Sequence, residues 1–207
     1  MMISNLDELN EMHIDILREI GNIGAGNAAT SLSQMLMKKV DMNVPEVKLL
    51  DFQEATELMG GPETVVLGIL VKMTDDIEGM VMFLLKKEFV SMVINSLIGT
   101  EVESFEQVGE MEFSALQEVG NIMIASYINS IAGLTGLRID ISVPALTIDY
   151  AGAMLSVPAI EFANVSDKVI FIEEKFKAEE EEVDSHILLI PDVKSLNKLL
   201  AGLGIEI

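Results

Sequence analysis

The sequence contains no cysteine and no tryptophan. The missing cysteines exclude disulfides, iron–sulfur clusters and thiol nucleophiles. Aromatic residues make up only 5% of the chain, so the core must be built mainly from Ile, Leu, Val and the 14 Met residues. Met fills irregular gaps well, and most of these Met residues are expected to be ordinary core.

Basic residues are also scarce, since 13 Lys and Arg stand against 34 Asp and Glu, giving a formal net charge of −21. Such a surface repels phosphate backbones and anionic lipid, so neither nucleic acid nor membrane is expected as a partner. A partner with a basic rim, or with a lysine near its own site, would be attracted. The same charge would also simply keep a chain that is 50% hydrophobic in solution, and composition leaves both explanations open.

A targeting or membrane segment is not expected. Asp7, Glu8 and Glu11 lie at the N-terminus, where a secretory signal would have a cationic run before an apolar stretch. Residues 119–137 have no charge and are long enough to span a membrane. They also include Asn, Ser, Thr and Gly residues, which favours a buried helix. The expected location is cytoplasmic.

The chain repeats itself. Residues 15–24 (DILREIGNIG) resemble residues 114–123 (SALQEVGNIM), and the separation of 99 also relates Pro45 to Pro144. Further on, residues 80–84 align with 186–190 at a separation of 106. This predicts about seven additional residues in the second half, which we place in the acidic stretch 173–184 and interpret as a solvated connection between strands.

Each half has the same predicted elements. A long helix, at about 6–38 and 105–136, is followed by a strand that starts near the proline. A hairpin (64–73 with 78–85; 166–175 with 184–190) and a shorter helix (87–98; 193–202) complete each half. No linker rich in Gly, Pro or Ser separates the halves. We predict one domain, residues 1–207, in which two repeats, about 6–99 and 105–204, share one sheet.

Polar residues of the repeat fall on one face of each long helix. At about 100° per residue, the first, fifth and eighth residues of the motif lie within about 60° of one another, opposite the apolar stripe. A solvated helix face is the ordinary explanation. It is weakened because the pattern recurs at the same angles, and because Asn is a mediocre helix former that gains nothing from exposure in mid-helix. The candidate site residues are Glu19, Asn22, Glu118 and Asn121.

Other chemistry finds less support in the sequence. The small residues after the first motif, from Gly24 to Ala29, resemble a phosphate loop only weakly, because no strand precedes them and no Lys-Ser/Thr follows. Close helix packing, or room for a partner, explains them better. The only two histidines, His13 and His186, do not recur at matching positions, so a metal cluster or a Ser-His-Asp arrangement is not expected.

The two motifs resemble the signature of the CheC/CheX/FliY family of chemotaxis phosphatases. That signature has Asp or Ser first, then Glu, Asn and Pro at fixed spacings, and both copies are complete: Asp15, Glu19, Asn22 and Pro45, then Ser114, Glu118, Asn121 and Pro144. The resemblance covers the whole chain. Two complete motifs are typical of the CheC branch, because CheX-type chains typically keep one motif and work as dimers and FliY-type chains carry an added C-terminal domain.

The resemblance implies an α/β (α+β) fold, internally duplicated, with a central, largely antiparallel sheet and the two long motif helices on one side. It implies hydrolysis of the aspartyl-phosphate of phosphorylated CheY, and the receptor deamidase CheD as a second partner. No cofactor of the chain's own is implied, and Mg²⁺ is expected to be carried by the response regulator.

Roles for the motif residues follow from this resemblance. The Asn amides would orient an attacking water, because an amide both donates and accepts hydrogen bonds and stays neutral. The Glu residues would pair with a lysine of the response regulator. Asp15 and Ser114 are expected to support the site, whereas Pro45 and Pro144 are expected to shape the connection from helix to strand.

Two other functions stay open at this point. A non-catalytic adaptor would sequester phosphorylated CheY or CheD, although the intact Asn in both copies argues against it. A nucleotide-binding regulator is less favoured. A monomer is expected, because a duplicated chain already supplies the twofold symmetry of a homodimer. Residues 150–158 (YAGAMLSVP) are apolar where residues 51–59 are polar, which indicates either a surface for CheD or a simple difference in the core.

Overall fold

The computed structural model describes residues 3–162, 166–178 and 181–205. Its helices and strands follow one another in an order that is nearly the same in both halves of the chain. In the first half they are η1 (Leu6–Glu8), α1 (Glu11–Leu36), β1 (Val40–Met42), β2 (Glu46–Asp51), α2 (Phe52–Leu58), β3 (Val65–Asp75), β4 (Gly79–Leu85) and α3 (Lys87–Ile98). In the second half they are η2 (Phe105–Gln107), α4 (Glu110–Thr135), β5 (Ile139–Ile141), β6 (Ala145–Tyr150), α5 (Ala151–Glu161), β7 (Lys168–Ala178), β8 (Glu181–Pro191) and α6 (Val193–Gly202).

One sheet contains strands from both halves. Its order is β1-β7-β8-β4-β3-β5, with β2 also paired to β7 and β6 also paired to β3. The strand pairs of the described residues are all antiparallel. In the centre β4 lies beside β8, and Met82 is opposite Leu188. The two halves therefore exchange strand pairings. β7 of the second half pairs with β1 and β2 of the first, and β3 of the first half pairs with β5 and β6 of the second.

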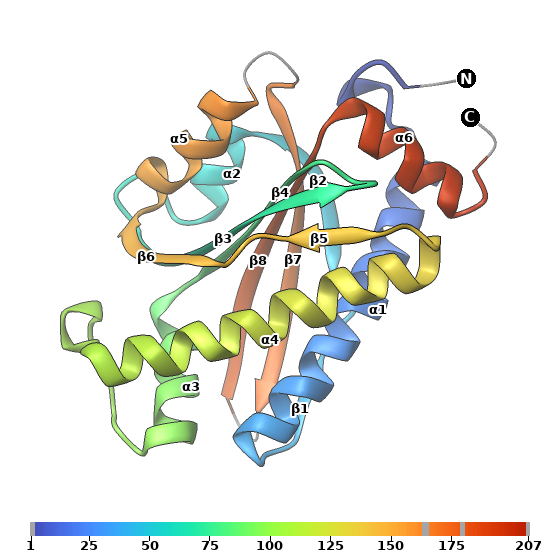
Figure 1. Cartoon of the computed structure of the whole chain (residues 1–207). Helices are drawn as coiled ribbons and strands as arrows, with labels where there is room; N and C mark the ends of the chain where they lie inside the picture. Colours follow the sequence, from blue (N-terminus) through green and yellow to red (C-terminus); the bar gives the residue numbers. More distant parts are fainter. Residues whose placement is uncertain (1–2, 163–165, 179–180, 206–207) are drawn as a thin grey trace.

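Helices cover both faces of this curled sheet. On one face α1 and α4 cross each other, with α3 and α6 beside them, and the other face carries α2 and α5 (Figure 1). Successive residues of β4 serve the two faces in turn: Val81 and Phe83 pack under α1 and α4, whereas Met80, Met82 and Leu84 pack under α2 and α5. A strand buried on both faces reads as a continuous hydrophobic run, as β4 does.

The fold class predicted from the sequence is confirmed. The helices α3 and α6 have the predicted bounds, and both hairpins lie where they were expected. Each long helix is shorter than predicted because a separate 3₁₀ turn, η1 or η2, precedes it. The short strands β1 and β5 and the helices α2 and α5 were not predicted. The seven residues of α2 are too few for a clear period, and α5 is apolar on most sides and contains Pro158.

The interpretation of residues 173–184 as a solvated connection was wrong. β7 continues to Ala178 and β8 begins at Glu181, so most of this acidic stretch lies in the sheet; residues 179 and 180 are outside the described residues. Side chains of a strand point alternately to its two faces. Glu173 is therefore half-buried on one face, while Glu174 is 1% exposed on the other.

The additional residues of the second half lie mainly in α5. Ile69 in β3 and Ile172 in β7 occupy equivalent places beneath the glycine of each motif, and they are 103 positions apart. The motifs themselves are 99 apart, and α5 has 11 residues where α2 has 7, which accounts for the difference of four. Ile69 pairs with Phe83 and Ile172 with Ile187, so β4 and β8 are related by 104 positions rather than 106.

No helix of the described residues is long and apolar enough to cross a membrane. The window 119–137 lies mostly in α4, which buries one side against α1 and the sheet, as expected of a buried helix.

Candidate functional site

Both motif helices begin with a fixed first turn. At the start of α1, Asn10 Oδ1 accepts a hydrogen bond from the His13 backbone N–H, and His13 Nδ1 accepts one from the Asn10 N–H, each at 3.1 Å. At the start of α4, the Gly109 N–H donates to Glu112 Oε2 at 3.0 Å. These bonds satisfy N–H groups that a helix start leaves unpaired. His13 therefore has a structural role that the sequence did not indicate.

Exposure of the motif side chains follows the helical wheel only in part. Asp15, Glu19 and their counterparts Ser114 and Glu118 are exposed, as predicted. The two Asn residues are half-buried, so the expectation that they point away from the core like the Glu residues was wrong in degree. Asn22 and Asn121 lie about 60° around the wheel from the Glu, towards the flank of the helix.

Asp15 pairs with Arg18 in the first site. Its Oδ1 accepts a hydrogen bond from Arg18 Nη1 at 2.6 Å, and both side chains are largely exposed. An exposed ion pair of this kind contributes little stability. Asp15 and Arg18 therefore form a small exposed polar pair, with Asp15 one turn before Glu19 and Arg18 immediately before it.

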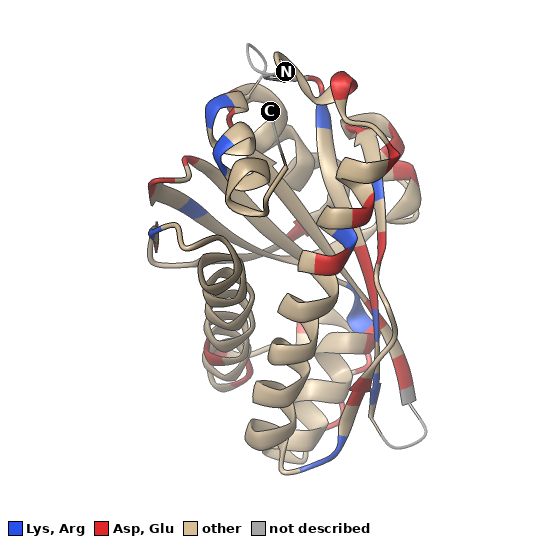
Figure 2. Ribbon diagram, turned by 90° about the vertical axis from the view of Figure 1, so that its right-hand side faces the viewer, with Lys and Arg blue, Asp and Glu red and all other residues tan. Residues whose placement is uncertain are grey.

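The charges of both helices are confined to the motif end. After Glu19, α1 has no charged residue up to its end, and α4 has none after Glu118. Figure 2 shows the remainder of the two helices without charge, in a molecule where acidic residues dominate elsewhere. Each motif is thus a local acidic feature next to a long neutral surface.

The two helices cross through paired polar contacts. Asn27 Nδ2 donates to Ser130 Oγ at 2.8 Å, and Ser31 Oγ lies 2.9 Å from Ser126 Oγ. Shifting either contact by 99 positions gives the other, so an approximate twofold axis passes between them. The crossing point is seven residues beyond each Asn, or about 10 Å at 1.5 Å per residue. The motifs therefore lie on opposite sides of the crossing, about 20 Å apart along the helix pair.

Small residues of α1 make this crossing possible. A Cβ on Gly24 would lie 2.8 Å from the Tyr127 ring, and a Cβ on Gly21 would lie 3.3 Å from the Tyr127 hydroxyl and 3.3 Å from Pro45 Cγ. Close packing therefore explains Gly24 and the buried Ala residues after it. Gly26 is different, because it faces open space on the motif side of the helix. Pro45 packs on the helix one residue before Asn22.

The residues packed beneath the second motif differ from those beneath the first. Gly120 lies directly against Ile69, whose Cδ1 would have to move to admit a Cβ, because the two atoms would be 2.4 Å apart. Next to it, the Asn121 Oδ1 atom is buried and has no hydrogen-bond partner. Leaving a buried polar atom unpaired costs about 1–3 kcal/mol. Orphaned groups of this kind concentrate where a site is built for a function rather than for stability.

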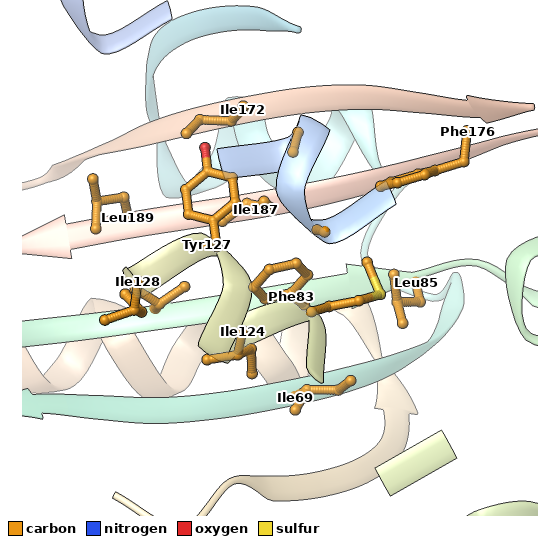
Figure 3. Close-up of a cluster of buried hydrophobic side chains, with 14 of the residues drawn as sticks. Ile69, Phe83, Leu85, Ile124, Tyr127, Ile128, Ile172, Phe176, Ile187 and Leu189 are labelled. Atoms are coloured by element: carbon orange, nitrogen blue, oxygen red, sulfur yellow. The ribbon is translucent and has the colours of Figure 1, made fainter. Parts of the chain in front are cut away.

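A buried polar cluster lies beneath the first site only. Tyr127 projects from α4 between the helices and the sheet, with its hydroxyl towards Ile172 (Figure 3), and its ring meets Phe83 edge to face at 6.2 Å. Glu174 lies on the same strand face as Ile172, and Ser185 Oγ donates to its Oε2 at 3.3 Å. Glu174 Oε1 and the Tyr127 hydroxyl have no partner. In the first half the residues equivalent to Glu174 and Tyr127 are Val71 and Ala28.

Burial controls the protonation of this cluster. Loss of water raises the pKa of Glu174 to about 8, although the Ser185 hydrogen bond opposes this. Burial, and then the nearby Glu174, raise the pKa of Tyr127 well above its ordinary value. The cluster was missed in the sequence because Glu174 sits in an acidic run. The signal was its spacing of two from Ile172 and Phe176, which are buried on the same face.

Among the residues that the structure describes, no group of three or more His, Asp or Glu side chains could hold a metal ion. A shallow depression of about 510 Å³ lies beside the second motif, lined by Val108, Gly109, Glu110, Phe113, Ser114 and Gln117. The outer face of each motif is otherwise open. Two outward Glu-x-x-Asn faces on separate ends of a helix pair suit contact with a macromolecule better than enclosure of a small molecule.

Comparison with known proteins identifies this arrangement. The model of the CheC-like family matches residues 12–49 and 111–148, two segments that are 99 positions apart and contain the two motifs. The chain is 36% identical over 200 residues to the CheY-P phosphatase CheC of Bacillus subtilis, covering 95% of this chain and 96% of that protein. The chain belongs to the CheC-like family.

Two further relatives agree with this assignment. The flagellar motor switch phosphatase FliY of Bacillus subtilis is 31% identical over 147 residues, which are 70% of this chain and 38% of that longer protein. The crystal structure of Thermotoga maritima FliY superimposes with a TM-score of 0.77 at 25% identity, covering 95% of this chain and 98% of that one. The resemblance stated from the two motifs is therefore confirmed.

Proposed function

We propose that this chain hydrolyses the aspartyl-phosphate of phosphorylated CheY. It is a phosphatase of the CheC-like family, as its relatives at 36% and 31% identity are. The observation that carries the more detailed proposal is the recurrence of Glu and Asn, three residues apart, on the outer face of both α1 and α4. The response regulator would dock on this face and bring the phosphoryl group to the Asn.

Asn22 and Asn121 are proposed to place the attacking water. An acyl phosphate is already reactive, so the enzyme mainly has to hold water in line with the leaving oxygen. A half-buried amide suits this, because packing limits its rotation while one side stays open.

Glu19 and Glu118 are proposed to grip the partner. Both are exposed one turn before the Asn, where a lysine of the response regulator could reach them. The negative charge at the motif end of each helix would also attract a basic rim. Mg²⁺ would belong to the substrate, bound by the response regulator together with the phosphoryl group.

We further infer that the chain is one domain of two repeats, 6–99 and 105–204, and acts as a monomer. The shared sheet and the approximate twofold axis between α1 and α4 support this, because they supply internally what two copies would otherwise supply. Sedimentation at micromolar concentration tests it, and a dimer would refute the monomer.

Purified CheY carrying the phosphoryl group provides the direct test of the function. The chain is expected to accelerate phosphate release at substoichiometric concentration. Slow release together with tight binding would instead identify the adaptor that sequesters phosphorylated CheY. Nucleotide-dependent melting would identify the nucleotide-binding regulator.

We propose α5 as the surface for CheD. Three large apolar residues in or next to α5 are exposed, namely Tyr150 (54%), Val157 (45%) and Ile160 (77%). The equivalent of Tyr150 in the first half is Asp51, and Ile160 lies in the part of α5 that α2 lacks, so these two exposed apolar residues occur in the second half only. Ile160→Glu is expected to abolish binding of CheD in a pull-down with purified proteins, and unchanged binding would refute this placement.

A further inference from the structure

Exposed apolar side chains flank both motifs at matching positions. Met12 is 54% exposed and its counterpart Met111 is 67% exposed; Val44 is 68% exposed and its counterpart Val143 is 84% exposed. Each pair is separated by the same 99 positions as the Glu and Asn residues. Single exposed hydrophobic residues are ordinary, but the same two beside the same motif in both halves require a reason.

The Met residues belong to the motif face. Met12 precedes Asp15 by three residues, so it lies about 60° from Asp15 on the wheel and one turn before it. Met111 stands in the same relation to Ser114. Met12 is not needed to start its helix, because Leu9 and Ile14 at the start of α1 already pack against the core. Met12 and Met111 thus extend the outward stripe at its N-terminal end.

The Val residues are held rigidly beside the helices. Val44 precedes Pro45, which packs on α1 at Gly21. The loop before it is pinned to the sheet, since the Asn43 N–H donates to the Lys175 carbonyl at 3.1 Å.

The loop of the second half is pinned in the same way. The Ser142 N–H donates to the Lys72 carbonyl at 2.9 Å, and the Lys72 N–H donates to Ser142 Oγ at 3.0 Å. Val143 follows directly. The fold therefore presents an exposed Val on a fixed backbone twice.

We propose that Met12 with Val44, and Met111 with Val143, are apolar anchors that dock the phosphorylated response regulator at the two sites. This inference rests on the proposed function and adds to it the residues that set affinity. The Met lies about 15 Å from the motif Asn along the helix. A typical protein interface covers roughly 800 Å² on each partner and is wide enough to include both. A few well-buried anchor residues supply most of the binding energy of such interfaces, and polar contacts accompany them.

The occupant is a receiver surface that combines an apolar patch with a lysine. The anchors flank Glu19 and Glu118, and an interface of ordinary size centred on the motif is wide enough to cover them. A second copy of this chain is the less suitable occupant, because it would bring the same acidic residues against each other in a protein of net charge −21.

The test isolates one site. In a Glu118→Lys, Asn121→Ala background the second site loses both its proposed partner contact and its Asn, so only the first site remains, and Met12→Ser with Val44→Ser removes the anchors of that site. Met37→Ser with Leu58→Ser is the matched control, because Met37 (91% exposed) and Leu58 (43% exposed) are apolar and lie away from the motif. Two readings are taken: KM and kcat for phosphate release from phosphorylated CheY, and Kd for CheY activated with beryllofluoride. Circular dichroism melting checks the fold.

The anchor variant is expected to raise KM and Kd about tenfold while kcat changes less than twofold, and the control to leave all three within twofold. Equal KM and Kd for the anchor variant and its parent would overturn the proposal. Loss of a dimer in the anchor variant, with Kd unchanged, would also overturn it by assigning the surface to a second copy. If the parent binds CheY but does not release phosphate from it, the proposed catalytic function is refuted. The comparison of Kd between the parent and the anchor variant still tests whether the anchors bind CheY.

Discussion

Replacing Glu174 with glutamine is expected to stabilise the fold, by an amount that grows with pH. Glu174 is 1% exposed, and its pKa of about 8 in the folded chain compares with an ordinary value of 4.5. Below pH 4.5 both the folded and the unfolded chain hold the proton, so ionisation of the carboxyl does not change the free energy of unfolding. Between pH 4.5 and 8 the unfolded chain loses its proton and the folded chain keeps it. The free energy of unfolding therefore falls as pH rises through this window.

The size of this effect follows from the two pKa values. Each pH unit corresponds to about 1.4 kcal/mol, so the full window amounts to about 5 kcal/mol. Glutamine has nearly the same shape, cannot ionise and can still accept the Ser185 hydrogen bond. The Glu174→Gln variant should therefore match the parent near pH 4.5 and exceed its free energy of unfolding by about 3–5 kcal/mol at pH 8.

Urea denaturation followed by circular dichroism at pH 5, 6, 7 and 8 measures this difference. Glu173→Gln is the control with the opposite sign. Burial acts to raise the pKa of Glu173, but the Lys48 hydrogen bond and charge outweigh it, so the pKa is lowered overall. That variant should lose stability at neutral pH and approach the parent in acid. If the free energy of unfolding of Glu174→Gln differs from that of the parent by the same amount from pH 5 to 8, the raised pKa of Glu174 is refuted.

The other variants probe packing and docking separately. Gly24→Ala should lower the free energy of unfolding by about 1–3 kcal/mol, since its Cβ would meet the Tyr127 ring at 2.8 Å. Gly26→Ala should raise it by about 0.5–1 kcal/mol, since nothing lies within 4 Å of that Cβ. Equal melting temperatures for the two variants would contradict this description of the packing. Tyr127→Phe removes a buried hydroxyl without a partner and should leave stability equal or about 1 kcal/mol higher, so a clear loss in urea titration would show that the hydroxyl is bonded. Glu19→Gln with Glu118→Gln should raise KM for phosphorylated CheY about tenfold and weaken its salt dependence, and an unchanged affinity in single-turnover kinetics would remove the proposed lysine contact.

The sequence predicted elements well where one period dominates. The helices α3 and α6 have strong amphipathic patterns, and β3 and β4 of the first hairpin are long apolar runs on either side of a tight turn. α5 was missed because its apolar residues have no clear period and Pro158 interrupts them. The acidic run around Glu174 was misread because charge was weighed above alternation, although only alternation reports which strand face a residue occupies.

The candidate site, like the fold, could be predicted from the sequence only in part. Repetition of Glu19 and Asn22 at Glu118 and Asn121 could be seen directly, and it led to the correct family. The half-burial of the Asn residues depends on loops and strands far away in the sequence, such as the Pro45 loop against Gly21. The Tyr127 and Glu174 cluster depends on the crossing of α1 and α4, so a helical wheel of either helix alone does not contain it.

Phosphate release from phosphorylated CheY by the Asn22→Ala, Asn121→Ala double variant tests the central claim most directly. The single variants should each keep part of the activity, because the motifs lie about 20 Å apart and act separately. The double variant should keep the parental melting temperature within about 3 °C and release phosphate no faster than CheY alone. Release at the parental rate by a folded double variant would contradict the account.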